Sequence, residues 1–340
     1  MSADSPFSIL DDEGQLRAGI DAALVPAIDD ASAVRLYRGM LQVRLVDEQM
    51  TKLQAAGRIS FYLSSRGEEA THFGGAYPLH DSDWIFPGYR EPGLAFWRGY
   101  SVQEYVNQLF GNAEDLVKGR QMPVHHAVRR IHYVSISSPA GTQIPQAMGM
   151  GWAARTAKRN DLAITYFGAA ATATGEFHVG LNFAGVFRAN VIFFCRNLIA
   201  ADVPSTEPNP ARKALAYGVR AVRVDGTDLL AIVAVVADAA TRARAGQGAT
   251  LIEAEIRSSD PIERFAKYLI GRNLWSEGLR DRFTQEITAE IQAACVHAEA
   301  VGMPPIESLF DDVFAQIPPH LVEQKATCLA LPRQQPLSGS

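Results

Sequence analysis

The sequence predicts an α/β fold in which a parallel sheet is covered by helices on both faces. Three observations point to it: the apolar runs are short, they are apolar at nearly every position, and segments of helical periodicity separate them. A strand buried on both faces is apolar throughout, whereas a half-exposed strand alternates between apolar and polar residues. The predicted strands are residues 162–167, 191–195, 221–224 and 250–256, and the predicted helices among them are residues 146–159, 175–187, 227–245 and 262–271.

Helical extensions are expected at both ends of this core. Residues 33–57 carry an apolar stripe at helical spacing, formed by Leu36, Met40, Val43, Met50 and Leu53. Near the C-terminus, residues 279–301 form a second amphipathic helix. We therefore predict one α/β domain over residues 32–325, preceded by a polar arm outside the core (residues 1–31) and followed by a flexible tail (residues 326–340).

The composition excludes several classes of function. The chain has 340 residues and a net charge of −5, which argues against a nucleic-acid-binding protein because such proteins carry a basic stripe. No run of 18 apolar residues and no signal peptide is visible, so we expect a cytoplasmic protein with no membrane partner. The three cysteines lack paired spacing, and we expect Cys195 and Cys295 to be packing residues.

Residues 60–130 read as short helical pieces broken by glycine and proline, typical of loops that converge on a site. Two histidines within this region, His125 and His126, are adjacent. Their side chains should point in different directions on either a helix or a strand. The eight histidines of the chain form no zinc-binding pattern.

Several segments in a fixed order carry a family resemblance. They are GRISFYLSSRGEEATHFGGA from Gly57, WIFPGYREPG from Trp84, GNAEDLVKGRQMPVHH from Gly111, SISSPAGTQIPQAMG from Ser135 and DDVFAQIPPHL near the C-terminus. With them the chain resembles the α subunit of the decarboxylating component of branched-chain 2-oxoacid (2-oxoisovalerate) dehydrogenase complexes, over nearly its whole length.

The resemblance implies a thiamine-diphosphate-binding fold and an assembly of two α and two β subunits. In that family the cofactor and its Mg²⁺ bind between the subunits, and the β subunit supplies the glutamate that activates the aminopyrimidine. No catalytic residue is therefore assigned to this chain, which is not expected to turn over substrate alone. A lipoyl-bearing acyltransferase is a further partner that the resemblance suggests.

The resemblance also implies roles for particular residues. Cofactor-binding positions are matched by Tyr89, Arg90, Ser138, Ala140, Arg196 and Asn197. Arginine suits a diphosphate because its planar fork donates to two phosphate oxygens. A potassium-binding loop found in some members is matched by Ser137, Pro139, Thr142 and Gln143, although the same residues also make a good helix start before Ile144. Both interpretations stay open at this point.

The chain departs from the family at the metal positions. Members carry an acidic residue after the first glycine of the turn at Gly168, and Asn-Asn after the next strand; here Ala169 and Leu198 stand in place of the two ligands. Mg²⁺ prefers oxygen ligands, and these side chains offer none. The nearest acids that could replace them are Glu176, Asp202 and Glu207.

A second departure follows the strand that ends near Ile256. The family has a long loop there with a histidine that faces the cofactor, whereas only residues 257–260 precede Pro261 in this chain. Asp260 and Pro261 are good residues for starting a helix. Three functions therefore remain: an α-like subunit with a non-standard or impaired site, a working thiamine-dependent subunit, and a pocket repurposed for another ligand or for thiamine-independent chemistry.

Overall fold

The computed structural model describes residues 1–199 and 209–331, and it contains the predicted parallel sheet. Five strands lie in the order β1-β2-β3-β5-β4, and every neighbouring pair is parallel. The strands are β1 (Trp84–Phe86), β2 (Ala163–Gly168), β3 (Val191–Leu198), β4 (Arg220–Asp225) and β5 (Thr250–Ile256).

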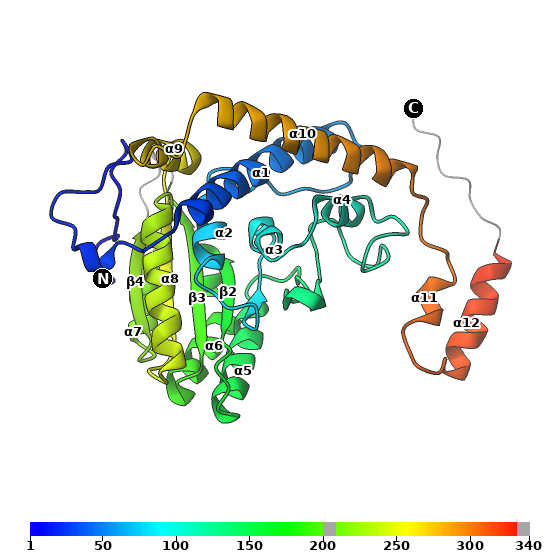
Figure 1. Ribbon diagram of the computed structural model, residues 1–340. Coiled ribbons are helices and arrows are strands. Elements are labelled where there is room, and N and C mark those ends of the chain that lie inside the picture. The colour runs from blue at the N-terminus through cyan, green and yellow to red at the C-terminus, as the bar shows by residue number, and fades with distance from the viewer. Residues whose placement is uncertain (200–208, 332–340) are drawn as a thin grey trace.

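Helices cover both faces of the sheet, as predicted (Figure 1). On β3, Ile192 and Phe194 belong to the larger core, which packs beneath α1, α2 and α8, while Phe193 and Cys195 face the smaller core beneath α5, α6 and α7. Both faces of the strand are thus buried, which explains its continuous apolar sequence.

The helices of the described residues, in chain order, are α1 (Asp30–Ala55), α2 (Glu69–Ala76), α3 (Pro92–Trp97), α4 (Val102–Phe110), α5 (Gln143–Thr156), α6 (Gly175–Phe187), α7 (Pro210–Leu215), α8 (Leu229–Arg244), α9 (Pro261–Gly271), α10 (Glu277–Ala300), α11 (Ser308–Asp311) and α12 (Pro319–Ala330). Among these helices, none is both long and apolar enough to cross a lipid bilayer.

The predicted bounds of the elements agree with the structure to different degrees. The bounds of α6 and β5 are those predicted. Strand β3 continues three residues beyond the prediction, because its pairing with β5 extends to the register Leu198↔Ile256. Strand β1 was not predicted, since only three residues form it and glycine and proline follow within two residues.

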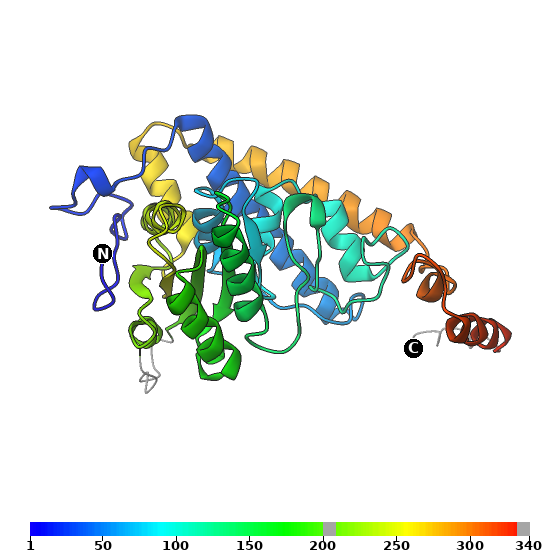
Figure 2. The same cartoon turned by 90° about the horizontal axis from the view of Figure 1, so that it is seen from below.

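The C-terminal part of the chain leaves the sheet. Helix α10 runs along α1, and α11 and α12 lie beyond its end, away from the sheet in both views (Figures 1 and 2). Helix α12 continues to Ala330, so the predicted flexible tail from residue 326 begins inside a helix. Helix α12 buries none of its own residues within this chain.

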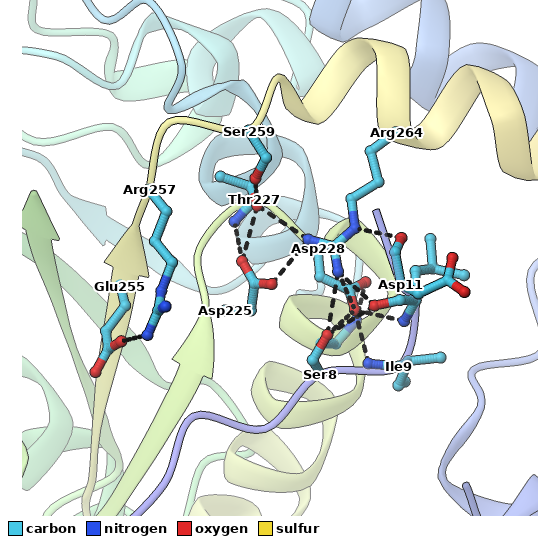
Figure 3. Close-up of polar contacts among 12 residues, drawn as sticks. Ser8, Ile9, Asp11, Asp225, Thr227, Asp228, Glu255, Arg257, Ser259 and Arg264 are labelled. Atoms are coloured by element: carbon cyan, nitrogen blue, oxygen red, sulfur yellow. Dashed lines mark hydrogen bonds and ion pairs between the residues drawn. The ribbon is translucent and has the colours of Figure 1, made fainter. Parts of the chain in front are cut away.

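The N-terminal segment contradicts the expectation of an arm outside the core. Ile9 and Leu10 are fully buried, and Phe7 forms a parallel bridge to Val224 at the free edge of β4. Two buried apolar side chains supply the anchor, which the polar average composition of residues 1–31 conceals. Figure 3 shows this segment in polar contact with Asp228, at the start of α8, and with Arg264 of α9.

Asp228 holds the N-terminal segment in place and starts helix α8. Its Oδ2 accepts hydrogen bonds from the backbone N–H groups of Ile9 (2.6 Å) and Leu10 (2.7 Å) and from the Ser8 hydroxyl (3.0 Å). Its Oδ1 accepts from Ala231 N at 3.1 Å, which is N-cap geometry. One buried carboxylate therefore joins residues more than 200 positions apart.

Replacing Asp228 with alanine should lower the free energy of unfolding by about 2–4 kcal/mol, because buried N–H groups and the helix cap would lose their acceptor. Urea denaturation measures the loss, and hydrogen exchange at Ile9 and Leu10 locates it. Asp21→Ala is the matched control: Asp21 caps an exposed turn through Ala23 N (2.9 Å), so its loss should stay below about 1 kcal/mol. Equal losses for the two variants would contradict the anchoring role.

Candidate functional site

The expected site lies at the carboxyl edge of the sheet. Parallel strands end at one edge, and there β2 ends at Gly168, β3 at Leu198 and β5 at Ile256. The loop after β1 carries Tyr89 and Arg90 to the same edge. The predicted cofactor residues therefore come from segments that the topology brings together.

Tyr89 and Ser138 meet directly. The Tyr89 hydroxyl donates to the carbonyl oxygen of Ser138, and the Ser138 hydroxyl lies 2.9 Å from Nε2 of His125. The rings of Tyr89 and His125 pack with centroids 5.6 Å apart. Burial raises the pKa of Tyr89, and the nearby Glu91 carboxylate adds to the effect. The sequence motifs do not assign His125 to the site, although it stands in the VHH segment that carries part of the family resemblance.

Arg90 and Ala140, the next two predicted cofactor residues, make fewer contacts with other predicted site residues. The Arg90 side chain is half-buried, and its Nη1 donates to the carbonyl oxygen of Ser64, in the loop before α2. Ala140 is exposed in the loop before α5. Arg90 is thus a cation near the edge, with one of its donors committed to the backbone.

Arg196 lies in a buried ion-pair cluster on the α2 side of the sheet. Its Nε is 2.6 Å from Oε1 of Glu91, and its Nη1 contacts Oε2 of Glu68. All three side chains are at most 6% exposed. One cation therefore faces two carboxylates in a medium where charge interactions are strong.

The pKa directions follow from this arrangement. Burial acts to lower the pKa of Arg196, but Glu91 and Glu68 outweigh burial and raise it. Burial raises the pKa of Glu91 although Arg196 opposes the rise. The neighbouring His72 is driven the other way: burial, and then the charge of Arg196, lower its pKa to about 3. His72 is thus a neutral imidazole at neutral pH.

Asn197 faces away from Arg196. Because successive residues of a strand point to opposite faces, its side chain lies on the α7 side, where Nδ2 donates to Oε1 of Glu253 at 2.8 Å. The other carboxylate oxygen of Glu253 accepts from Ala211 N at 2.9 Å. The structure thus separates Arg196 and Asn197, two residues that the resemblance placed around one ligand.

The described residues do not fit a magnesium-bound diphosphate. Ala169 begins a 3-10 turn after β2, and Leu198 ends β3 with 62% of its surface exposed. Neither side chain has an oxygen, and Glu176 is an exposed residue of the first turn of α6. Within residues 1–199 and 209–331 no three His, Cys, Asp or Glu side chains gather as metal ligands. The other two acids considered, Asp202 and Glu207, lie outside the described residues.

The predicted potassium loop forms the start of a helix. Helix α5 begins at Gln143, the Thr142 hydroxyl donates to the carbonyl oxygen of Pro139 at 3.0 Å, and Gln143 Nε2 donates to the carbonyl oxygen of Tyr166 at 2.7 Å. The helix-start interpretation is thereby confirmed. Ser137 is half-buried beside it, and potassium binding by these four residues stays a prediction.

The connection from β5 to α9 is short, and it is held firmly. Asp260 caps α9 by accepting from Ile262 N at 2.9 Å, as the sequence predicted. Its other oxygen pairs with Arg44 at 2.8 Å. Beside it, a cavity of about 690 Å³ opens between the N-terminal segment and the ends of β4 and β5. Arg264 borders this cavity, with its donors bonded to Asp225 and to the N-terminal segment (Figure 3).

Comparison with known proteins places the chain. Residues 37–256 match the family described as dehydrogenase E1 component. The chain is 35% identical to 2-oxoisovalerate dehydrogenase subunit alpha 1, mitochondrial, of Arabidopsis thaliana, over 97% of this chain and 76% of that protein. It is 36% identical to the alpha subunit of Caenorhabditis elegans (90% and 78% covered) and 34% identical to that of Homo sapiens (94% and 78% covered). With a fold that agrees, the chain belongs to the dehydrogenase E1 component family, on the branch of the branched-chain 2-oxoacid dehydrogenase α subunits.

Proposed function

We propose that this chain is an α-like subunit of a 2-oxoacid dehydrogenase-type complex whose cofactor site is non-standard and catalytically impaired. It acts with a β subunit, in a heterotetramer of two α and two β chains, and a lipoyl-bearing acyltransferase is a further partner. The family is thiamine diphosphate dependent. This chain keeps the family's architecture but no longer binds that cofactor in the standard way.

The observation that carries the proposal is the state of Arg196. A diphosphate needs unpaired positive charge, whereas Arg196 is already matched by Glu68 and Glu91 inside the protein. Without a Mg²⁺ ligand at Ala169 or Leu198, the diphosphate would have to displace these carboxylates unaided. The short loop at Asp260 also supports a non-standard site. Asp260 is held by its cap on α9 and by its ion pair with Arg44, so the loop is well ordered at its short length.

Calorimetry tests the proposal. The full chain, alone and mixed with a purified β-type subunit, is titrated with thiamine diphosphate plus Mg²⁺. We expect a stable α–β complex with no micromolar, Mg²⁺-dependent binding. The double variant Ala169→Glu, Leu198→Asn restores both ligand types and should bind at least about tenfold more tightly than the wild type.

Micromolar, Mg²⁺-dependent binding by the wild type would contradict the proposal and support a working thiamine-dependent subunit. One observation favours that second function: Tyr89 and Ser138, both matched to cofactor positions, are in direct contact. Turnover of 2-oxoacids by the α–β complex also separates the two functions: a working subunit supports it, and an impaired one does not.

A further inference from the structure

Ser138 and His125 form a serine–histidine pair at the start of helix α5. The Ser138 Oγ lies 2.9 Å from Nε2 of His125, which is hydrogen-bonding distance. The histidine lies in the loop after α4, and the serine precedes α5, so the fold brings them together across 13 positions. Contact between a nucleophile and a base is the first geometric requirement of nucleophilic catalysis.

The second requirement is a group that orients the base. Nδ1 of His125 lies 3.1 Å from the carbonyl oxygen of Pro123, which can only accept a hydrogen bond. Nδ1 therefore carries the proton of the neutral ring and donates it to this carbonyl. Nε2 is left with a lone pair facing Ser138, whose hydroxyl then donates to it. This tautomer is the one that a general base needs.

The histidine of the pair is buried and the serine is exposed, which suits a fixed base beside an accessible nucleophile. His125 is 4% exposed, so its ring is held by the protein, while Ser138 is exposed and open to a substrate from solvent. The Tyr89 hydroxyl donates to the carbonyl oxygen of Ser138 and so holds the backbone of the serine. The hydroxyl is thus presented on a fixed segment.

We propose that Ser138 is an acyl-accepting nucleophile, with His125 as its general base, and that this pair hydrolyses small acyl esters or thioesters. Ser138 Oγ bonds to the acyl carbon while its proton passes to Nε2 of His125. The ester or thioester bond then breaks, and the departing alcohol or thiol takes that proton. Water, deprotonated by the same nitrogen, releases the carboxylic acid and restores the serine. The reaction uses no thiamine diphosphate and does not rest on the function proposed above.

The test uses the full chain with 4-nitrophenyl butyrate as the probe and butyryl thioester as the second acyl donor. We expect a burst of 4-nitrophenolate and a butyryl adduct on the peptide that contains Ser138, found by mass spectrometry. Ser138→Ala should abolish the adduct. His125→Asn keeps a donor for the Pro123 carbonyl and removes the base, so it should slow acylation at least about 100-fold. Ser135→Ala, at a neighbouring exposed serine, is the matched control and should react as the wild type does.

Three results would overturn the proposal. One is the absence of any adduct on the folded wild-type chain. Another is an undiminished adduct in Ser138→Ala, which would mean unselective acylation elsewhere. The third is wild-type acylation by His125→Asn, which would mean that the histidine only holds the loop. Circular dichroism of each variant checks its folding, and an unfolded His125→Asn chain leaves Ser138→Ala, at an exposed position, to decide.

Discussion

Replacing Arg196 with methionine should lower the free energy of unfolding by about 3–5 kcal/mol. The new side chain fills most of the same space but leaves Glu68 and Glu91, each 1% exposed, buried without their cation. The cost is that of two uncompensated buried carboxylates, and it exceeds the value of the attraction itself. Urea denaturation of the full chain near neutral pH measures it.

Two further variants make this prediction specific. Arg257→Met removes an ion pair of similar length, 2.8 Å to Glu255, but Arg257 is 57% exposed, so the loss should be below about 1 kcal/mol. Adding Glu91→Gln to Arg196→Met removes one of the stranded charges and should recover part of the stability. A loss below about 1 kcal/mol for Arg196→Met would contradict the buried ion-pair cluster.

Acid should destabilise the chain well before its carboxylates titrate in the unfolded state. Burial lowers the pKa of both His72 and His126 to about 3, from an ordinary value of 6.5. Between these values the unfolded chain binds a proton on each ring and the folded chain does not, so stability rises with pH across this window and falls as pH drops through it. The slope is about 1.4 kcal/mol per pH unit for each imidazole.

Comparison of variants isolates the imidazole contribution. Burial raises the pKa of Glu69 and Glu91, so these carboxyls take up protons in the folded chain first and oppose the loss at low pH. His72→Gln removes one titrating ring without changing them, and its stability should depend less steeply on pH from 6.5 downward. His320→Gln, at an exposed position on α12, should follow the wild-type curve. Identical curves for all three proteins would contradict a buried neutral His72.

Much of the fold was predictable because apolar periodicity reports burial locally. The bounds of α6 and β5 were predicted from their apolar positions, although both elements also contain charged residues. The N-terminal anchor was not predictable, since only Ile9 and Leu10 reveal it and their acceptor, Asp228, is more than 200 residues away. Local patterns carry no record of a partner that distant.

The candidate site was likewise predictable only in part. The sequence motifs located Tyr89, Ser138 and Arg196 and showed that Ala169 and Leu198 offer no metal ligands. The motifs did not show that Asn197 points to the opposite face of β3 from Arg196. That follows only because β3 continues through Asn197, beyond its apolar run, and successive strand residues point to opposite faces. His125 was equally hidden, since nothing in the spacing shows that it meets Ser138.

The sequence by itself determined the parallel α/β fold, the family and the chemical identity of the residues at the carboxyl edge. Only the tertiary structure decided which of those residues are available to a ligand. The sequence already identifies Arg196 as a cation. Only chain folding brings Glu68, 128 positions away, into contact with it. The physical reason is that a side chain's charge belongs to the residue, whereas the field and the partners that it meets belong to the packed molecule.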